Sequence, residues 1–332
     1  MTKQWWQPHI FNRKLDNLSK RQAVIETIRG FFKQRDFLEV DTPALQTSPG
    51  LEVHLHAFKT RFVDPYGQRD MDYMLHTSPE FTMKKLLVAG LPRIYSMGKV
   101  WRNNERSALH HPEFTMLEWY RAGVDYNAIM QDTKDLVTAC YGACGADIAK
   151  EWEYLTVADA FEKYAGIDIL ATDYDVAKLR QDAGRAGVSF SPQDSWDDIY
   201  YRIMMDKIEP FLGFSAPTFL CEYPIRMAAL SRPKPGNPAV AERVELYIDG
   251  LELANGFSEL TDWAVQLERF QEEVREKQRG YGEAYPIDMD FIDALKHGMP
   301  QCSGIALGVD RLVMAICKAH SIEDVLWAPV AY

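Results

Sequence analysis

Two stretches of charged and aromatic residues, far apart in the sequence, have the composition of a nucleotide site. The first, Val100–Tyr120, reads VWRNNERSALHHPEFTMLEWY, and the second, Gly304–Arg311, reads GIALGVDR. An arginine followed by a polar loop and an aromatic segment suits a strand–loop–strand unit around a nucleotide, because a guanidinium presents a fixed fork of donors to phosphate. A glycine-spaced segment ending in Asp-Arg suits a strand and a helix that close over the same nucleotide, since glycine permits close backbone approach.

A predicted hairpin over Arg243–Asn255 places two carboxylates together. Its Asp-Gly pair is a two-residue turn signal between alternating apolar residues. This turn sets Tyr247 opposite Glu252, so that Glu245 and Glu252 are diagonal neighbours on one face, within roughly 8 Å. Two such carboxylates repel unless a cation lies between them, and Mg²⁺ takes ligands from one or two carboxylates plus substrate phosphates. On the hairpin alone, the alternative interpretation is that Glu245 and Glu252 simply lie on a polar face exposed to solvent.

Further acidic residues predict a pocket for an ammonium group. Gly256 is expected to break the strand, so that Asn255, Phe257 and Glu259 line a pocket. A substrate with a terminal ammonium needs buried acceptors, because an unpaired charge costs several kcal/mol in a dry site. The candidates are the carboxylates of Glu118 and Glu259, the Tyr120 hydroxyl, and the polar groups of Ser78 and Glu80 at a helix start.

The elements that must position these residues alternate between helices and strands. Ser19–Arg35 is predicted to be an amphipathic helix that begins with a capping box, after an irregular arm over residues 1–18. The other predicted helices are one with Ser78 at N-cap and Pro79 at N1 that stops at Gly90, Asp125–Tyr141, one capped by Ser195 and Asp198, Trp263–Arg279 ended by Gly280, and Asp310–Lys318. The predicted strands are Phe37–Val40, Leu75–Thr77, Arg93–Trp101, Phe114–Tyr120, Phe219–Tyr223 and Ile305–Val309, and Ser231–Pro238 is predicted to be a loop.

Composition is that of a soluble globular chain. The 332 residues carry a net charge of −11, which opposes non-specific binding to phosphate backbones. No apolar run is long enough to span a bilayer and no secretory signal is visible, so a cytoplasmic location and no membrane partner are expected. Five cysteines, a small and odd number, do not indicate a disulfide framework.

Val100–Tyr120 and Gly304–Arg311 resemble motifs 2 and 3 of class II aminoacyl-tRNA synthetases, specifically those of the lysyl branch. The helix and strand that end in Asp41-Thr42-Pro43 resemble motif 1, which is the dimer element of that class. The resemblance implies an α+β fold in which an antiparallel β-sheet is flanked by helices. It also implies a homodimer, and one catalytic domain over residues 1–332 with a helical insertion around residues 150–235.

The resemblance assigns the nucleotide site. Arg102 matches the arginine that holds the α-phosphate of ATP, Phe114 the aromatic that stacks on adenine, and Arg311 the arginine on the other side or on the terminal phosphate. The remaining predicted ATP contacts are Asn103, Asn104, His111, Glu252, Leu253 and Gly308. The family usually has Arg-Asn-Glu where this chain has Arg102-Asn103-Asn104-Glu105, so either Asn104 or Glu105 reads the adenine amino group.

The resemblance also assigns the amino-acid and metal sites. The run Leu251–Leu260 is similar to the lysyl-synthetase segment with metal-binding and lysine-binding groups. Mg²⁺ is then expected on Glu245 and Glu252. The predicted substrate contacts are Ser78, Pro79, Glu80, Glu118, Tyr120, Asn255, Phe257, Glu259 and Ala306.

The acceptor follows from what precedes motif 1. Lysyl-tRNA synthetases place an anticodon-binding barrel there, and none fits before residue 19. The chain thus resembles the truncated paralogues that attach lysine, preferably (R)-β-lysine, to elongation factor P, with no tRNA. Ala306 stands where lysyl synthetases usually have glycine. Its methyl group could favour (R)-β-lysine by making the binding of lysine less favourable by roughly 1–3 kcal/mol.

Three alternatives remain on the sequence alone. A minimal lysyl-tRNA synthetase would need a tRNA-binding partner. A tRNA-independent asparagine synthetase is a relative of similar size, although Glu118 and Glu259 suit an ammonium-bearing substrate better than aspartate. A catalytically inactive adaptor would not be expected to keep the residue set Arg102, Glu245, Glu252 and Arg311.

Overall fold

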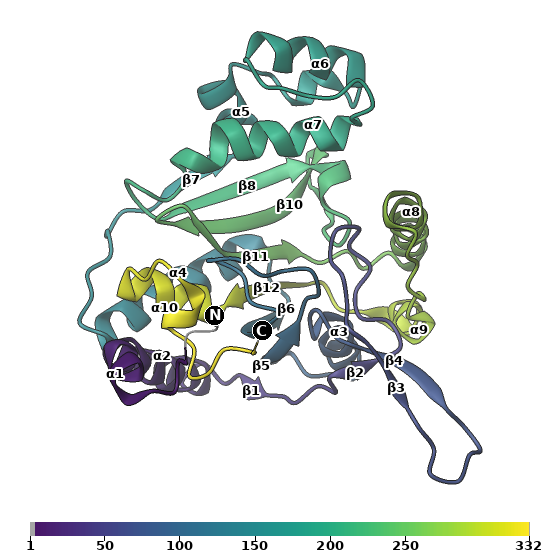
Figure 1. Ribbon diagram of the computed structural model, residues 1–332. Coiled ribbons are helices and arrows are strands. Elements are labelled where there is room, and N and C mark those ends of the chain that lie inside the picture. The colour runs from purple at the N-terminus through teal and green to yellow at the C-terminus, as the bar shows by residue number, and fades with distance from the viewer. Residues whose placement is uncertain (1–3, 332) are drawn as a thin grey trace. The chain divides into compact units, whose positions relative to one another are not determined.

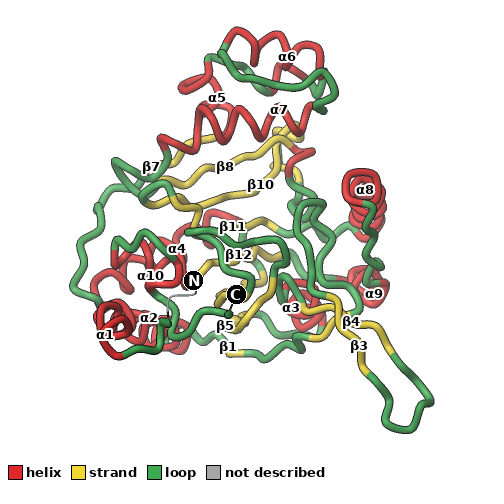
Figure 2. The backbone as a smooth tube through the Cα atoms, viewed as in Figure 1, coloured by secondary structure: helices red, strands yellow, loops and turns green. Residues whose placement is uncertain are grey.

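The computed structural model describes residues 4–331, and the chain divides into two compact units. Unit 1 comprises Met1–Ile148 and Glu259–Tyr332, and unit 2 comprises Ala149–Ser258. Each unit contains strands with helices packed on them (Figures 1 and 2). Among residues 4–331, no helix has both the length and the hydropathy that crossing a membrane requires.

Unit 1 holds most of the helices. They are α1 (Pro8–Phe11), α2 (Leu15–Lys33), α3 (Glu80–Val88), α4 (Tyr126–Ala143), α8 (Trp263–Tyr281), α9 (Met289–Gly298) and α10 (Val309–Cys317). Its strands are β1 (Leu38–Glu39), β2 (Leu45–Gln46), β3 (Lys59–Phe62), β4 (Met71–Leu75), β5 (Arg93–Trp101), β6 (Glu113–Ala122) and β12 (Cys302–Gly308). The strand order is β1-β5-β6-β12 in one sheet and β2-β4-β3 in a second, and only the β1–β5 pair is parallel.

The alternation of side chains along β6 separates the core from the candidate site. Trp119 is fully buried and its ring lies 5.4 Å from that of Phe32 in α2, centroid to centroid. Glu118 and Tyr120, on either side of Trp119, point to the opposite face of the sheet, because successive strand residues alternate. Helices α2, α4 and α10 group on one side of these strands, and α3 and α9 on the other (Figure 1).

A buried charge network joins α2, β6 and α10. The Arg21 guanidinium donates to Asp310 Oδ1 and, at 2.9 Å, to Thr115 Oγ1. The Thr115 N–H donates to Asp310 Oδ2 at 2.6 Å. Both Arg21 and Asp310 are buried, at 4% and 1% exposure, so each charge depends on the other for compensation. This network fixes the start of α10, and hence Arg311, against β6.

Unit 2 is built from a hairpin, three further strand pairings and three α-helices. Its elements are β7 (Glu153–Thr156), α5 (Val157–Ala165), α6 (Val176–Arg185), α7 (Trp196–Ile203), β8 (Thr218–Pro224), β9 (Pro233–Lys234), β10 (Asn237–Ile248) and β11 (Leu251–Ser258). The order β11-β10-β8-β7 is antiparallel except for β7–β8, and β9 pairs with β10. Residues of α5, α6 and α7 share one hydrophobic core with β8 and β10, including Phe161, Trp196, Tyr200 and Leu220.

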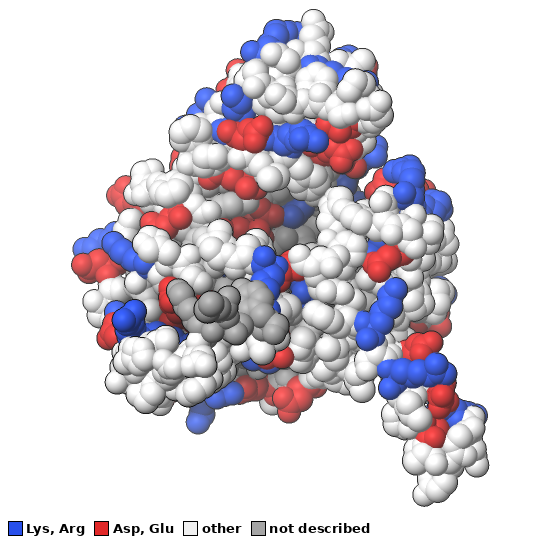
Figure 3. Space-filling model, in the orientation of Figure 1, with Lys and Arg blue, Asp and Glu red and all other residues white. Residues whose placement is uncertain are grey.

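The expected α+β class, with mainly antiparallel strands flanked by helices, is confirmed. β5 has the predicted bounds, and Ser195 and Asp198 form the predicted capping box. The helical segment predicted around residues 150–235 corresponds to α5–α7 of unit 2. Lys and Arg are interspersed with Asp and Glu over the face drawn in Figure 3.

Several predicted boundaries are wrong. The irregular arm over residues 1–18 is helical from Pro8 onward, and α2 begins at Leu15 because Ser19 Oγ donates to the Leu15 carbonyl within the helix instead of capping it. Pro79, not Ser78, is the N-cap of α3. Helix α8 passes through Gly280 and ends at Gly282, which adopts the left-handed conformation with φ 67°. The predicted loop over Ser231–Pro238 contains β9.

Replacement of Asp310 by alanine tests the network. We expect Asp310→Ala to lower the free energy of unfolding by about 3–5 kcal/mol, because it leaves Arg21 charged, buried and uncompensated. Asp16→Ala is the control. The Asp16–Lys20 pair lies on α2, the helix that carries Arg21, and it is largely exposed, so it should contribute little to the free energy of unfolding. Urea unfolding measures both variants, and equal effects would contradict the role of the network.

Candidate functional site

The loop between β5 and β6 brings Arg102 beside Phe114. The two strands pair in register, with Val100 opposite Phe114, and the Arg102 N–H donates to the Pro112 carbonyl at 3.0 Å. The guanidinium carbon of Arg102 then lies 5.2 Å from the centroid of the Phe114 ring. A guanidinium next to an aromatic face can hold a phosphate and a base at one place, because its donors and the ring face point into the same space.

The four residues after Trp101 differ in their surroundings. The Asn103 side-chain oxygen accepts from the Asn104 N–H at 2.9 Å, so the backbone of the loop already uses it. Asn104 is exposed with φ 65°, a conformation that asparagine tolerates better than most residues. Glu105 is half-buried and close enough to His110 to act on its pKa.

His110 joins this loop to Arg311. Arg311 Nη2 lies 2.8 Å from His110 Nε2, and Ser107 Oγ lies 2.9 Å from His110 Nδ1. Burial lowers the pKa of His110, and the charges of Arg311 and Arg102 lower it further. A neutral imidazole can accept a hydrogen bond from Arg311. Both arginines therefore lie near one side chain, as expected for two segments around one nucleotide.

His111, the predicted nucleotide contact, is engaged by the protein. It is buried, with Nδ1 2.5 Å from the Glu113 carbonyl oxygen, and its Nε2 accepts from the Val330 N–H at 3.1 Å. Both of its ring nitrogens thus have partners within the chain. Sequence reasoning chose between adjacent histidines without a signal to separate them, and it missed His110.

A cluster of buried acidic residues lies beside the start of α3. Ser78 Oγ donates to Glu118 Oε1 at 2.5 Å, and the Tyr120 hydroxyl donates to Glu118 Oε2 at 3.1 Å. Gly304 pairs with Tyr120 across β12 and β6, and a methyl group built on it would lie 2.2 Å from the Tyr120 ring and 3.0 Å from Glu259 Oε1. Glycine is therefore required at position 304 for Tyr120 to occupy this place, a requirement that sequence reasoning missed.

Lys84 lies among the carboxylates and was also missed. Its side chain is 1% exposed, its ammonium contacts Glu80 Oε1, and it lies 2.5 Å from Glu259 Oε2. Burial alone would lower the pKa of Lys84, but Glu259 and Glu80 raise it above its ordinary value. The i, i+4 spacing of Glu80 and Lys84 on a helix was the sequence signal that could have identified this pair.

The cluster contains more acid than base. Burial raises the pKa of Glu118 to about 8, with Glu80 adding to the effect. Burial also raises the pKa of Glu259 to about 7, although Lys84 opposes the shift. Glu259 Oε1 has no hydrogen-bond partner among residues 4–331, whereas Oε2 is paired with the Lys84 ammonium. A further cation at this cluster would be favourable, because it would let these carboxyl groups ionise without uncompensated charge.

In unit 2, Glu245 has partners that the sequence did not predict. Its Oε1 accepts from Arg243 Nη2 at 2.6 Å, and its Oε2 accepts from the hydroxyls of Tyr223 and Tyr247. The Arg243 guanidinium is thus a cation that already compensates Glu245, while the expected Mg²⁺ on Glu245 and Glu252 stays a prediction. Tyr247 does pair with Glu252, so the predicted shared face is retained.

Glu245 and Glu252 could supply only part of the ligands of a Mg²⁺ ion. Glu245 Oε1 keeps one lone pair after its bond to Arg243, and Glu252 lies on the same face. Within residues 4–331 there is no group of three or more His, Cys, Asp or Glu side chains placed to hold a metal ion. Magnesium bound here would need phosphate oxygens and water as further ligands, which is its common mode with nucleotides.

The remaining predicted residues lie along β11 and β12. The expected strand break at Gly256 is wrong, since β11 continues to Ser258 and the irregularity lies between Leu246 and Tyr247 of the partner strand. Asn255 Oδ1 accepts from Arg243 Nε at 3.3 Å. Leu253 is buried, and Phe257 follows Asn255 on the same face by alternation. In unit 1, Ala306 pairs directly with Glu118, and Gly308 is the N-cap of α10.

Comparison with known proteins identifies the family. The family model described as tRNA synthetases class II (D, K and N) matches residues 8–331. A protein of Yersinia enterocolitica named elongation factor P–(R)-β-lysine ligase is 40% identical over 327 residues, which cover 98% of this chain and 97% of the relative. Proteins with the same name from Yersinia pestis and Yersinia pseudotuberculosis are 39% identical over the same shares. The chain belongs to the class II synthetase family, in the branch of the elongation factor P–(R)-β-lysine ligases.

Proposed function

We propose that this protein activates lysine, preferentially (R)-β-lysine, with ATP and transfers it to the ε-amine of a lysine of elongation factor P. The observation that carries the proposal is the cluster of buried acidic residues, in which Glu80, Glu118 and Glu259 face the single ammonium of Lys84. Such a cluster favours a substrate with a terminal ammonium and disfavours aspartate. The names of the Yersinia relatives supply the isomer and the acceptor.

Activation needs alignment and positive charge more than it needs a base. The substrate carboxylate is already ionised when it attacks the α-phosphorus of ATP and pyrophosphate leaves. Arg102 would hold the α-phosphate and Arg311 the adenine or the terminal phosphate, with Phe114 stacked on the base. These residues would neutralise charge that develops in the transition state.

The other nucleotide and metal residues belong to the same proposal. Glu245 and Glu252 would hold Mg²⁺, which supplies positive charge to the phosphates when it is bound. Glu105 or Asn104 would read the adenine amino group, with Asn103, His111, Leu253 and Gly308 around the nucleotide. Ser78, Pro79, Tyr120, Asn255 and Phe257 would complete the amino-acid site.

Transfer completes the reaction. The acceptor lysine attacks the carbonyl carbon of the aminoacyl-adenylate, AMP leaves, and an amide bond forms. Because the acceptor is a protein, no tRNA is needed. A homodimer through the motif 1 region and a cytoplasmic location, where elongation factor P works, are parts of the proposal.

Mass spectrometry of elongation factor P tests the function. After incubation with this protein, ATP and (R)-β-lysine, we expect elongation factor P to gain one lysyl residue, and more slowly with lysine. Arg102→Ala should reduce the modification by at least about 100-fold, in the range reported for removal of a single charge-stabilising donor. Arg61→Ala, in the β3–β4 hairpin, is the matched control. Aminoacylation of tRNA without modification of elongation factor P would instead support a minimal lysyl-tRNA synthetase.

Ala306→Gly tests the isomer preference. Ala306 lies opposite Glu118 in the β12–β6 pairing, and directly paired residues share one face of the sheet. Removal of its methyl group should shift the ratio of kcat/KM toward lysine by roughly 10–200-fold, the usual range for one methylene in a pocket. ATP–pyrophosphate exchange with both isomers measures the ratio, and an unchanged ratio would show that Ala306 does not determine the isomer preference.

Proton release on lysine binding tests the charge of the cluster. The pKa of Glu118 is about 8 in the ligand-free protein, so the group is mostly protonated at pH 7. A bound ammonium should lower that pKa, release a proton and tighten lysine binding as the pH rises from 6 to 8. Calorimetry in buffers of different ionisation enthalpy measures the release. Glu118→Gln should reduce it to the part that Glu259, with a pKa of about 7, contributes, and an unchanged release would contradict the assignment.

The same shift sets the pH dependence of stability. An acid whose pKa is raised on folding binds more protons in the folded state between its unfolded and folded values. The free energy of unfolding of the ligand-free protein should therefore decrease as the pH rises from 4.5 to 8. Glu118→Gln should reduce this slope, and an identical slope in both proteins would contradict the assignment.

A further inference from the structure

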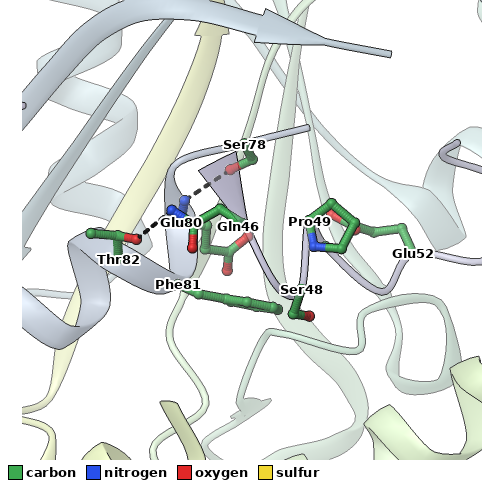
Figure 4. Close-up of a pocket in the computed structure, with 9 residues that line it drawn as sticks. Gln46, Ser48, Pro49, Glu52, Ser78, Glu80, Phe81 and Thr82 are labelled. Atoms are coloured by element: carbon green, nitrogen blue, oxygen red, sulfur yellow. Dashed lines mark hydrogen bonds between the residues drawn. The ribbon is translucent and has the colours of Figure 1, made fainter. Parts of the chain in front are cut away.

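A small pocket, open to solvent, lies at the start of α3 in unit 1. Ser78 and Glu80 line one side, and the loop that follows β2 lines the other with Ser48, Gly50 and Glu52 (Figure 4). Ser48 and Glu52 are not among the residues predicted for the site. The pocket therefore extends the amino-acid site toward a loop to which the proposed function assigns no role.

Two polar atoms of this loop lack partners. Ser48 is 4% exposed, and its Oγ has no hydrogen-bond partner among residues 4–331. Within the same described range, Glu52 Oε2 is shielded from solvent and also has none. Buried polar atoms in folded proteins are nearly always hydrogen-bonded, because an unpaired one keeps its full desolvation cost. Atoms of this kind that line a pocket indicate a ligand with donors.

The loop is held in place by the rest of unit 1. The buried ammonium of Lys277, from α8, donates to the carbonyl oxygens of Glu52 at 3.0 Å and Val53 at 2.9 Å. Gly50 has φ 132°, and a methyl group built on it would lie 2.7 Å from Thr77 Oγ1 and 2.8 Å from Glu52 Oε2. Glycine thus leaves the space into which the Glu52 carboxylate folds, and the carboxylate has a defined position.

The surroundings of Glu52 favour a cation. Burial raises the pKa of Glu52, and Glu80 raises it further, whereas Arg102 and Lys277 oppose the shift. Glu273, on α8, has its pKa raised to about 8 by burial and by the charges of Glu52 and Glu80. The carboxyl groups around the pocket therefore raise one another's pKa, and a bound cation would let them ionise. Glu52 is also near enough to Arg102 to interact with it, so it belongs to the end of the site where the substrate carboxylate would react.

We propose that Glu52 binds the amino group nearest the reacting carboxylate, which is the β-amine in (R)-β-lysine and the α-amine in lysine. The proposal rests on the proposed function. Glu118 and Glu259 would bind the terminal ammonium, and Arg102 would bind the phosphate to which the carboxylate is joined. An amine within two carbons of that carboxylate must lie at the Arg102 end of the substrate. Glu52 is thereby a specificity-determining residue that distinguishes diamino acids from amino acids with a terminal amine alone.

The test compares two ligands in three proteins. ATP–pyrophosphate exchange is measured with (R)-β-lysine as substrate and with 6-aminohexanoate, which lacks the α- and β-amines, as competitive inhibitor. Glu52→Gln should lower kcat/KM for (R)-β-lysine by about tenfold to a hundredfold, as for loss of a hydrogen bond to a charged group, and leave the inhibition constant unchanged. Glu273→Gln is the matched control, because it changes a carboxyl group of the same neighbourhood that does not line the pocket, and both values should be nearly unchanged.

Two other outcomes would overturn the proposal for Glu52. Equal weakening of both ligands would mean that Glu52 binds the terminal ammonium or only supports the fold. Normal ATP–pyrophosphate exchange together with slower transfer to elongation factor P would mean that Glu52 acts on the acceptor amine instead. If Glu52→Gln does not fold, Glu52→Asp, which keeps the charge but retracts it, should still weaken (R)-β-lysine selectively. Failure of the wild-type protein to exchange would defeat the proposed function instead, and calorimetric binding of both ligands would then still test Glu52.

Discussion

The burial of negative charge is the constraint on which the candidate site depends. Glu80, Glu118 and Glu259 are almost fully buried, and a carboxylate in such surroundings must be paired, hydrogen-bonded or protonated. Lys84 satisfies part of this demand, and Ser78 and Tyr120 satisfy another part by donating to Glu118. The remainder is unsatisfied, which is costly for the ligand-free protein and favourable for a cationic ligand. The cluster is thus less stable than an apolar core would be, as is common where binding residues are placed in advance.

Local patterns in the sequence predicted the elements well where one interaction decides the structure. The cap at Ser195 and the bounds of β5 depend on neighbours in sequence, and both were predicted. Ser19 fits a capping pattern equally well, yet it lies inside α2, where its hydroxyl donates to the Leu15 carbonyl. The β-bulge near Leu246 depends on how β10 meets its partner strands, for which the sequence carries no local signal.

The site residues show the same division. Arg102 and Phe114 could be found because a strand–loop–strand unit brings them together at short range. Gly304 and Glu52 could not, because their roles depend on contacts between segments about thirty to nearly two hundred residues apart. For Lys84, the i, i+4 spacing indicates only the pairing with Glu80, and the contact with Glu259 has no local signal. Arg243 was missed for a different reason. Its partner Glu245 is only two residues away, but a charged residue on a strand suggests solvent unless the burial of both faces is known.

The β12–β6 register connects the choice of isomer to the charge of the cluster. Ala306 and Gly304 pair with Glu118 and Tyr120, so two small residues face the two side chains that close the pocket floor. A side chain at 304 would collide with Tyr120, whereas position 306 accepts a methyl group. Under the proposed function, that methyl group would limit where the substrate backbone can lie. Because a shifted backbone would also move the amine relative to Glu52, steric and electrostatic selection would then act on the same part of the substrate.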